Sequence, residues 1–169
     1  MKPPFSVIFL TTLIGVGQGL FLALYTGQRL SDVLAMRWSA INAGGLLAVK
    51  QGKTGKELMI PLHRDLKAIL ETAPRTAVTI AATAEGRPWG KGFQNVWAKH
   101  RPAMVADSGL VFHGLRKSAV VTLLEAGCTD AEVAAITGQS RTMVEHYAKM
   151  VNQEKLARAA ILRWEQRTN

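Results

Sequence analysis

Five residues of types that could act on an anionic substrate are spread along the chain: Arg29, Lys53, His113, Arg116 and Tyr147. Arginine binds anionic oxygens, lysine and histidine transfer protons, and a tyrosine hydroxyl can act as a nucleophile. Taken singly, each of them is better explained as a surface charge, a helix cap or a half-buried polar residue. Their order and their surroundings in the sequence decide whether they form a site.

The elements that must position Arg29 are two helices. A buried apolar helix is predicted over residues 20–25 at least, and it ends at the break Thr26-Gly27. Apolar residues then recur at helical spacing over residues 30–36, so Arg29 is expected at the start of a second, short helix.

Lys53 is predicted to lie at or beside the tip of an antiparallel hairpin. The runs 46–50 and 57–62 flank the basic sequence Gln-Gly-Lys-Thr-Gly-Lys, which suits a tight turn. A helical period continues over residues 62–70, and residues 77–81 are a candidate third strand.

The second half of the chain is predicted to consist mainly of helices. His113 and Arg116 are expected at the start of one of them. The predicted helices are residues 93–101, residues 114–125 ending at Ala126-Gly127, a helix that begins at a Thr129 and Glu132 capping box and ends at Thr137-Gly138, a helix that carries Tyr147, and an amphipathic tail.

Taken together and in order, five short segments resemble the catalytic domain of the tyrosine recombinases, or phage integrases. The resemblance runs from about residue 20 to residue 164 and is specific, because His-x-x-Arg is followed about thirty residues later by the Gly-x-Ser and Tyr elements. It implies an α+β, mainly α-helical fold with a small antiparallel β-sheet. The segments are Tyr25-Thr-Gly-Gln-Arg29-Leu-Ser-Asp32, Lys53-Thr-Gly, Phe112-His113-Gly-Leu-Arg116, Ile136-Thr-Gly-Gln139-Ser and Glu145-His-Tyr147.

The resemblance also implies a reaction, site-specific recombination of DNA without a cofactor. Tyr147 would attack a DNA phosphodiester and form a 3′-phosphotyrosine link. Arg29 and Arg116 would bind the non-bridging oxygens of the phosphate, where the charge of the transition state grows. Lys53 would protonate the departing 5′ oxygen, and His113 would assist proton transfer or hold the phosphate.

Two further positions of the family pattern carry a polar side chain. Gln139 stands where most of the family has His or Trp. It can donate a hydrogen bond to the phosphate but cannot transfer a proton, so activity is expected to be weakened. Asp32 matches an acidic position with a structural role, and its charge is expected to orient Arg29 or a neighbouring helix end.

The composition fits one globular, DNA-binding domain. The chain has 169 residues, 48% of them hydrophobic, and a formal charge of +9, which favours a polyanionic partner. Double-stranded DNA and other recombinase subunits, arranged as a tetramer on DNA, are the partners that the resemblance implies. No metal is expected, because the single Cys128 and the four histidines, His63, His100, His113 and His146, show no ligand-like spacing.

Three stretches are expected along the chain: a divergent apolar segment over residues 1–19, the catalytic domain over residues 20–151, and a tail of the same domain over residues 152–169. The family's usual N-terminal DNA-clamping domain is not matched. Residues 5–25 carry no charge and are long enough to span a bilayer. Glycines and polar residues interrupt them, which favours a buried helix in a cytoplasmic, nucleoid-associated protein without a membrane anchor. The tail is expected to pack on a neighbouring subunit or back on its own domain.

Other functions compete with recombination. The sequence Gly52-Lys-Thr54 resembles the end of a phosphate-binding loop, but Leu47 stands where that loop needs glycine. Zinc and serine hydrolases lack their spacings, and a type IB topoisomerase, which uses the same tyrosine chemistry, fits the setting of Arg29 less well. The serious rival is a truncated, inactive DNA-binding or regulatory remnant that keeps the fold but no longer recombines.

Overall fold

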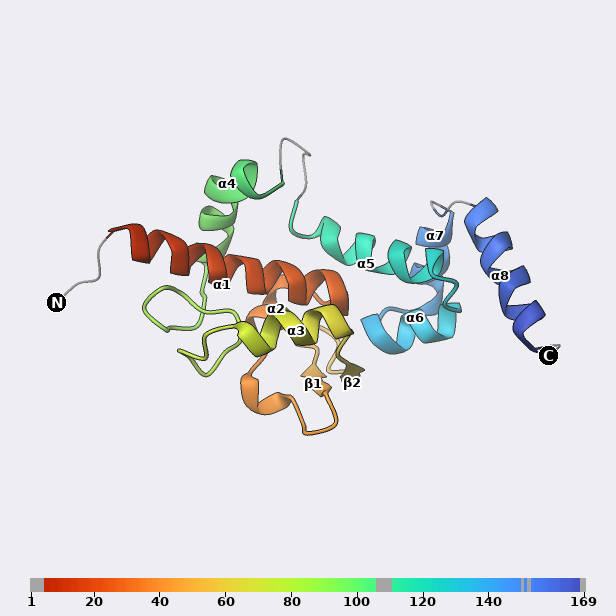
Figure 1. Ribbon diagram of the computed structural model, residues 1–169, viewed down its shortest axis with the longest axis horizontal. Coiled ribbons are helices and arrows are strands. Elements are labelled where there is room, and N and C mark those ends of the chain that lie inside the picture. The colour runs from red at the N-terminus through yellow and green to blue at the C-terminus, as the bar shows by residue number, and fades with distance from the viewer. Residues whose placement is uncertain (1–4, 106–110, 150, 152, 168–169) are drawn as a thin grey trace.

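The computed structural model describes residues 5–105, 111–149, 151 and 153–167 (Figure 1). Residues 1–4 of the expected N-terminal segment and residues 152, 168 and 169 of the expected tail lie outside that range. The described elements are α1 (Phe5–Thr26), α2 (Leu30–Ala35), the 3-10 helix η1 (Trp38–Ala40), β1 (Leu46–Lys50), β2 (Glu57–Pro61), α3 (Arg64–Thr72), α4 (Gly92–Val105), α5 (Gly114–Glu125), α6 (Asp130–Thr137), α7 (Arg141–Ala148) and α8 (Gln153–Arg167).

The architecture is mainly helical with a small antiparallel sheet, as predicted. Helix α1 runs along the molecule, with α4 on one side and α3 and the hairpin on the other (Figure 1). Helix α5 packs against α1 and continues toward the C-terminal end, where it also contacts α6 and α7. The elements expected to carry chemistry therefore gather around the ends of α1 and α5.

The hairpin follows the alternation expected of a half-buried strand. Leu47 and Val49 of β1 are buried, and Leu47 pairs with Ile60 of β2 in an antiparallel register. Alternate side chains point to opposite faces of a sheet, so Gln51 falls on the buried side just after β1. The connecting turn closes at Gly55, whose φ of +67° suits glycine.

Two groups of buried apolar residues hold the described part of the molecule together. The larger one surrounds α1 and includes Leu22, Leu47 and Phe93. The smaller one is formed by α5, α6 and α7 and contains four buried residues. Helix α5 belongs to both, because its Leu115 lies in the larger group and its Val120 in the smaller.

The ends of α6 were predicted correctly. Oγ1 of Thr129 accepts a hydrogen bond from the backbone N–H of Glu132 at 3.3 Å, and the Glu132 carboxylate accepts one from the backbone N–H of Thr129 at 2.6 Å. Gly138 ends the helix with a φ of +67°. Gly127 likewise has a positive φ, +86°, and directly follows Ala126, the C-cap residue of α5.

The candidate third strand was wrong. In the described residues the sheet has two strands, and residues 77–81 contribute only an isolated bridge between Arg37 and Thr79. The 3-10 helix Trp38–Ala40 follows Arg37 at once, so the chain turns away before a longer ladder can form.

Helix α1 is longer than the predicted core of residues 20–25 and runs unbroken across the expected boundary at residue 19. None of the helices in the described part combines the length and the apolarity that a membrane crossing needs.

Candidate active site

Loops that are far apart in the sequence meet at one place in the fold. One is the α1–α2 junction with Arg29, another is the hairpin turn with Lys53, and the third is the α6–α7 junction with Gln139. Hydrogen bonds between polar groups join the three loops. The first turn of α5 reaches the same place, because Arg116 Nη1 donates to Gly27 O at 2.6 Å.

Arg116 is the buried cation of the site, with only 6% of its surface exposed. Burial, and after it the charge of Arg29, lower the pKa of Arg116, whereas Asp32 and Tyr147 raise it; the net result is a pKa of about 10. Electrostatic coupling of this kind requires proximity. The structure therefore brings together four of the residues singled out in the sequence.

Two hydrogen-bond donors of the site point at no acceptor. Arg29 is half-buried and Gln139 is buried, yet Arg29 Nη1 and Gln139 Nε2 have no hydrogen-bond partner within the described residues. A buried donor without a partner costs free energy. An anion bound in the site would supply an acceptor to each of these two donors, and Asp32 Oδ2 is a buried acceptor of the same region that also has no partner in the described residues.

Asp32 is placed differently from its expected contact with Arg29 or a helix end. Its Oδ1 accepts a hydrogen bond from the backbone N–H of Gly52 at 2.8 Å, and no ion pair joins it to Arg29 in the described part of the chain. The carboxylate thus connects α2 to the start of the hairpin turn. A structural role for Asp32 remains a prediction, now with the hairpin as its partner.

Tyr147 lies in the last turn of α7, half-buried against the smaller apolar group. Helix α7 begins at Ser140, whose Oγ accepts a hydrogen bond from the backbone N–H of Met143 at 3.3 Å. Val144 is fully buried and packs α7 against the smaller apolar group. His146 is exposed and its ring meets that of Tyr147 edge to face, 5.6 Å between centroids.

Lys53 and His113 are both exposed at the edge of the site. Over residues 5–105 and 111–149 neither side chain makes a hydrogen bond or an ion pair with Arg29, Arg116, Gln139 or Tyr147, so the structure does not bring these two into contact with the others. Exposure leaves both side chains available to a ligand.

Three polar residues of the site were not singled out in the sequence: Gln28, Gln51 and Lys56. The Lys56 ammonium donates to Gly138 O at 3.1 Å, and both glutamines are buried. The alternation of buried side chains along β1 predicts that Gln51 is buried, because it follows Leu47 and Val49 at intervals of two. No comparable signal marks Gln28.

The described residues hold no group of three or more His, Cys, Asp or Glu side chains placed to bind a metal ion. Cys128 is half-buried between α5 and α6, and burial raises the pKa of its thiol. A raised thiol pKa lowers the fraction of reactive thiolate. Packing is therefore the role that its surroundings support.

The fold is a mainly helical domain in which two arginines and a tyrosine lie near one another, with an exposed lysine at the edge of the site. The chain belongs to the phage integrase family, whose model matches residues 19–154. All the candidate site residues fall within the matched range.

Individual relatives agree with the family. The chain is 29% identical over 135 residues to the shufflon-specific DNA recombinase of Escherichia coli, covering 76% of this chain and 33% of that protein. It is 46% identical over 48 residues to the integrase of Escherichia phage HK022, covering 28% of this chain and 13% of the phage protein. The chain thus spans about a third of the shufflon recombinase.

Solved structures give the same result for the fold. A lambda integrase dimer bound to a core site superposes with a TM-score of 0.65 at 28% identity, covering 85% of this chain and 56% of the integrase chain. The Tn1549 transposon integrase in complex with transposon right end DNA has a TM-score of 0.67 at 13% identity, with 89% of this chain and 59% of that chain covered. At that identity the second match supports the fold alone.

Proposed function

We propose that this domain performs site-specific DNA recombination by cleaving and rejoining DNA through Tyr147. One observation carries the proposal: Arg29 Nη1 and Gln139 Nε2 are buried donors without a partner in the described residues, and they accompany the charged Arg116 and Tyr147. A DNA phosphate supplies the oxygens that these donors need, and it places the phosphorus near a nucleophile.

The proposed first step forms one bond and breaks one. The Tyr147 oxygen attacks the phosphorus, its proton passes to a neighbouring base or solvent, and the bond from phosphorus to the 5′ oxygen breaks. Lys53 gives a proton to the departing 5′ oxygen, and the product is a 3′-phosphotyrosine. Attack by a second 5′ hydroxyl reverses the step, so the energy of the phosphodiester is kept.

The two arginines address the charge of the reaction. A phenol has a pKa of about 10 and is a weak nucleophile at neutral pH, while the phosphate repels an incoming anion. Arg29 and Arg116 would stabilise the negative oxygens of the transition state, with Gln139 adding a neutral hydrogen bond. His113 would hold the phosphate or assist proton transfer from the edge of the site.

The proposed partners are double-stranded DNA and further copies of the enzyme, assembled as a tetramer. The lambda integrase whose dimer is bound to a core site, and the chain's formal charge of +9, support this choice. A DNA-bound recombinase of this kind would work in the cytoplasm, at the nucleoid.

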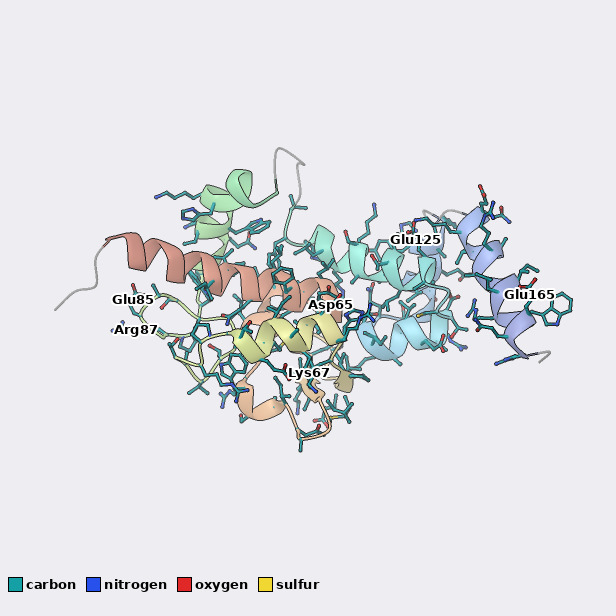
Figure 2. The ribbon with its side chains drawn as sticks, viewed as in Figure 1. Asp65, Lys67, Glu85, Arg87, Glu125 and Glu165 are labelled. Carbon is teal, nitrogen blue, oxygen red and sulfur yellow. The ribbon has the colours of Figure 1, made fainter. Side chains whose placement is uncertain are left out.

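Helix α8 is the proposed contact between subunits. It contacts the end of α5 and the connection that follows: Lys155 pairs with Glu125 of α5 at 2.9 Å (Glu125 is labelled in Figure 2), and Arg163 donates to Gly127 O after that helix. Ile161 and Leu162 are 49% and 58% exposed. Two large exposed apolar side chains on one helix suit a surface that another subunit covers.

A nicked suicide substrate tests the proposal. The nick lies next to the cleavage position, so the fragment released by attack diffuses away and the covalent adduct accumulates. We expect a protein–DNA band that resists denaturation and that disappears in Tyr147→Phe. Retained DNA binding with no adduct from the wild type would instead identify a DNA-binding remnant that no longer cleaves.

A further inference from the structure

A chain of buried amides links the three loops of the site. Gln51 is fully buried just after β1, and its Nε2 donates to Gln28 Oε1 at 2.6 Å and to Thr137 O at 3.0 Å. Gln28 is 1% exposed, and its Nε2 donates to Thr26 O at 2.9 Å and to Ile136 O at 3.1 Å. Both side-chain NH₂ groups thus use both of their hydrogens.

A fully satisfied buried network of this kind is rigid, because breaking any bond leaves an unpaired polar group in a medium of low dielectric constant. Its members come from residues that are 23, 86 and 108 positions apart. It therefore fixes the α1–α2 junction, the hairpin turn and the end of α6 relative to one another.

The space for the network depends on Gly138. A Cβ atom at this position would lie 2.4 Å from Gln51 Nε2, closer than non-bonded atoms can approach. The same glycine receives the Lys56 ammonium on its carbonyl oxygen at 3.1 Å. The residue that ends α6 thus also accommodates the hairpin, and Gln139 follows it directly.

The network also encloses the backbone of Lys53. Thr54 Oγ1 donates to Gln51 Oε1 at 2.7 Å, and the backbone N–H of Gly55 donates to Gln51 O at 2.8 Å. Lys53 lies between the residues that these bonds join. Its side chain is exposed, and the bonds of Thr54 and Gly55 to Gln51 hold the backbone on its C-terminal side.

We propose that Gln51 and Gln28 are positioning residues that hold the Lys53 hairpin against Arg29 and Gln139, so that they control proton delivery to the leaving oxygen. This inference rests on the proposed function. Neither glutamine touches the DNA in the proposal, because both are buried and their donors are occupied. Their effect passes through Lys53.

A change of leaving group isolates this effect. In a DNA substrate with sulfur in place of the 5′ bridging oxygen, the departing group is a thiolate. A thiol ionises near a pKa of about 8.5, so its departure needs no proton donor. A variant that only misplaces Lys53 should therefore recover on the sulfur substrate, whereas a variant with a damaged fold should be slow on both.

The experiment compares Gln51→Met with wild type on oxygen and sulfur suicide substrates, measuring the rate of covalent adduct formation. We expect a loss of roughly ten- to hundredfold on the oxygen substrate, part of what a positioned proton donor contributes, and a rate within about threefold of wild type on the sulfur substrate. Lys53→Ala should show the same pattern with a larger loss.

The matched control is Gln18→Met, which removes a buried amide from α1 whose Nε2 donates to no group in the described residues. It should leave both rates unchanged. Thr54→Val is the milder second variant: it removes one hydroxyl from an exposed turn and should give a smaller loss with the same recovery on sulfur.

The positioning role would be overturned if Gln51→Met slowed adduct formation equally on both substrates, or if neither Gln51→Met nor Thr54→Val slowed it on the oxygen substrate. In both cases an adduct formed by the wild type would still support the proposed function. An absence of adduct from wild type on both substrates would refute the proposed function itself, and the positioning role with it.

Discussion

Replacing Arg116 with methionine should abolish cleavage while leaving the domain about as stable as before. Burial and the Arg29 charge lower the pKa of Arg116 from its ordinary value to about 10, which corresponds to a folded-state cost of at most about 3 kcal/mol for keeping the charge. Because the folded pKa is the lower one, this cost is fully present below about pH 10 and decreases as the pH rises above that value. Methionine removes it.

The substitution also removes one hydrogen bond, from Nη1 to Gly27 O at 2.6 Å. A hydrogen bond made by a charged group contributes about 1.5–3 kcal/mol. Gain and loss nearly cancel, so the free energy of unfolding should change by no more than about 1.5 kcal/mol, a shift of about 3–6 °C in Tm for a chain of this size.

Two assays separate function from stability. Thermal unfolding measures Tm, and the nicked suicide substrate measures adduct formation, which we expect to fall by roughly 10² to 10³ or more. Arg116→Lys should fail as well, because an ammonium cannot bind two oxygens in parallel. The control is Arg64→Met, the same change at a side chain that is 91% exposed, and it should leave both measurements unaltered.

Either of two results would refute this reasoning. A fall in Tm of more than about 10 °C for Arg116→Met would mean a loss of at least about 2.5 kcal/mol, the behaviour of an ion whose role is to hold the fold. Adduct formation at the wild-type rate would remove Arg116 from the reaction.

Three further outcomes are expected. Gly138→Ala should destabilise the domain by about 1–3 kcal/mol in chemical denaturation and slow adduct formation, because φ is +67° and the new Cβ meets Gln51. An unchanged denaturation midpoint would contradict the close packing of Gly138 against Gln51. Thr129→Ala should lower the free energy of unfolding by about 1 kcal/mol through loss of the α6 cap, and the folded protein should still form the adduct. An unchanged free energy of unfolding would mean that the capping box contributes nothing to stability. Deleting α8 should lower solubility or change the oligomeric state in sedimentation, and an unaltered, monodisperse product would argue against a subunit contact.

Local signals in the sequence predicted the elements well. The capping box at Thr129, the glycine ends at Gly127 and Gly138 and the hairpin around Lys53 each depend on a few neighbouring residues, and the structure confirms all of them. The candidate strand over residues 77–81 was wrong because its pairing depends on a distant segment that turns away after one bridge.

Long-range contacts explain what the sequence could not provide. Its pattern supplied the types of the site residues, but the partner of Asp32 turned out to be Gly52 in another element. The hydrogen bond from Gln28 Nε2 to the carbonyl oxygen of Ile136 spans 108 positions, and the residues next to either partner in the sequence do not predict it. The roles of the individual site residues stay predictions until the variants are measured.

The small apolar group beneath Tyr147 has a consequence for motion. In the described part of the chain it contains four buried residues, Val120, Leu124, Val133 and Val144, whereas the group around α1 contains fifteen. Units that bury little apolar surface open at a lower free energy than the global unfolding of a domain. Amide hydrogens of α7 should therefore exchange with solvent well before those in the C-terminal half of α1. Tyr147 would then belong to a helix that can detach and re-dock while the rest of the domain stays folded.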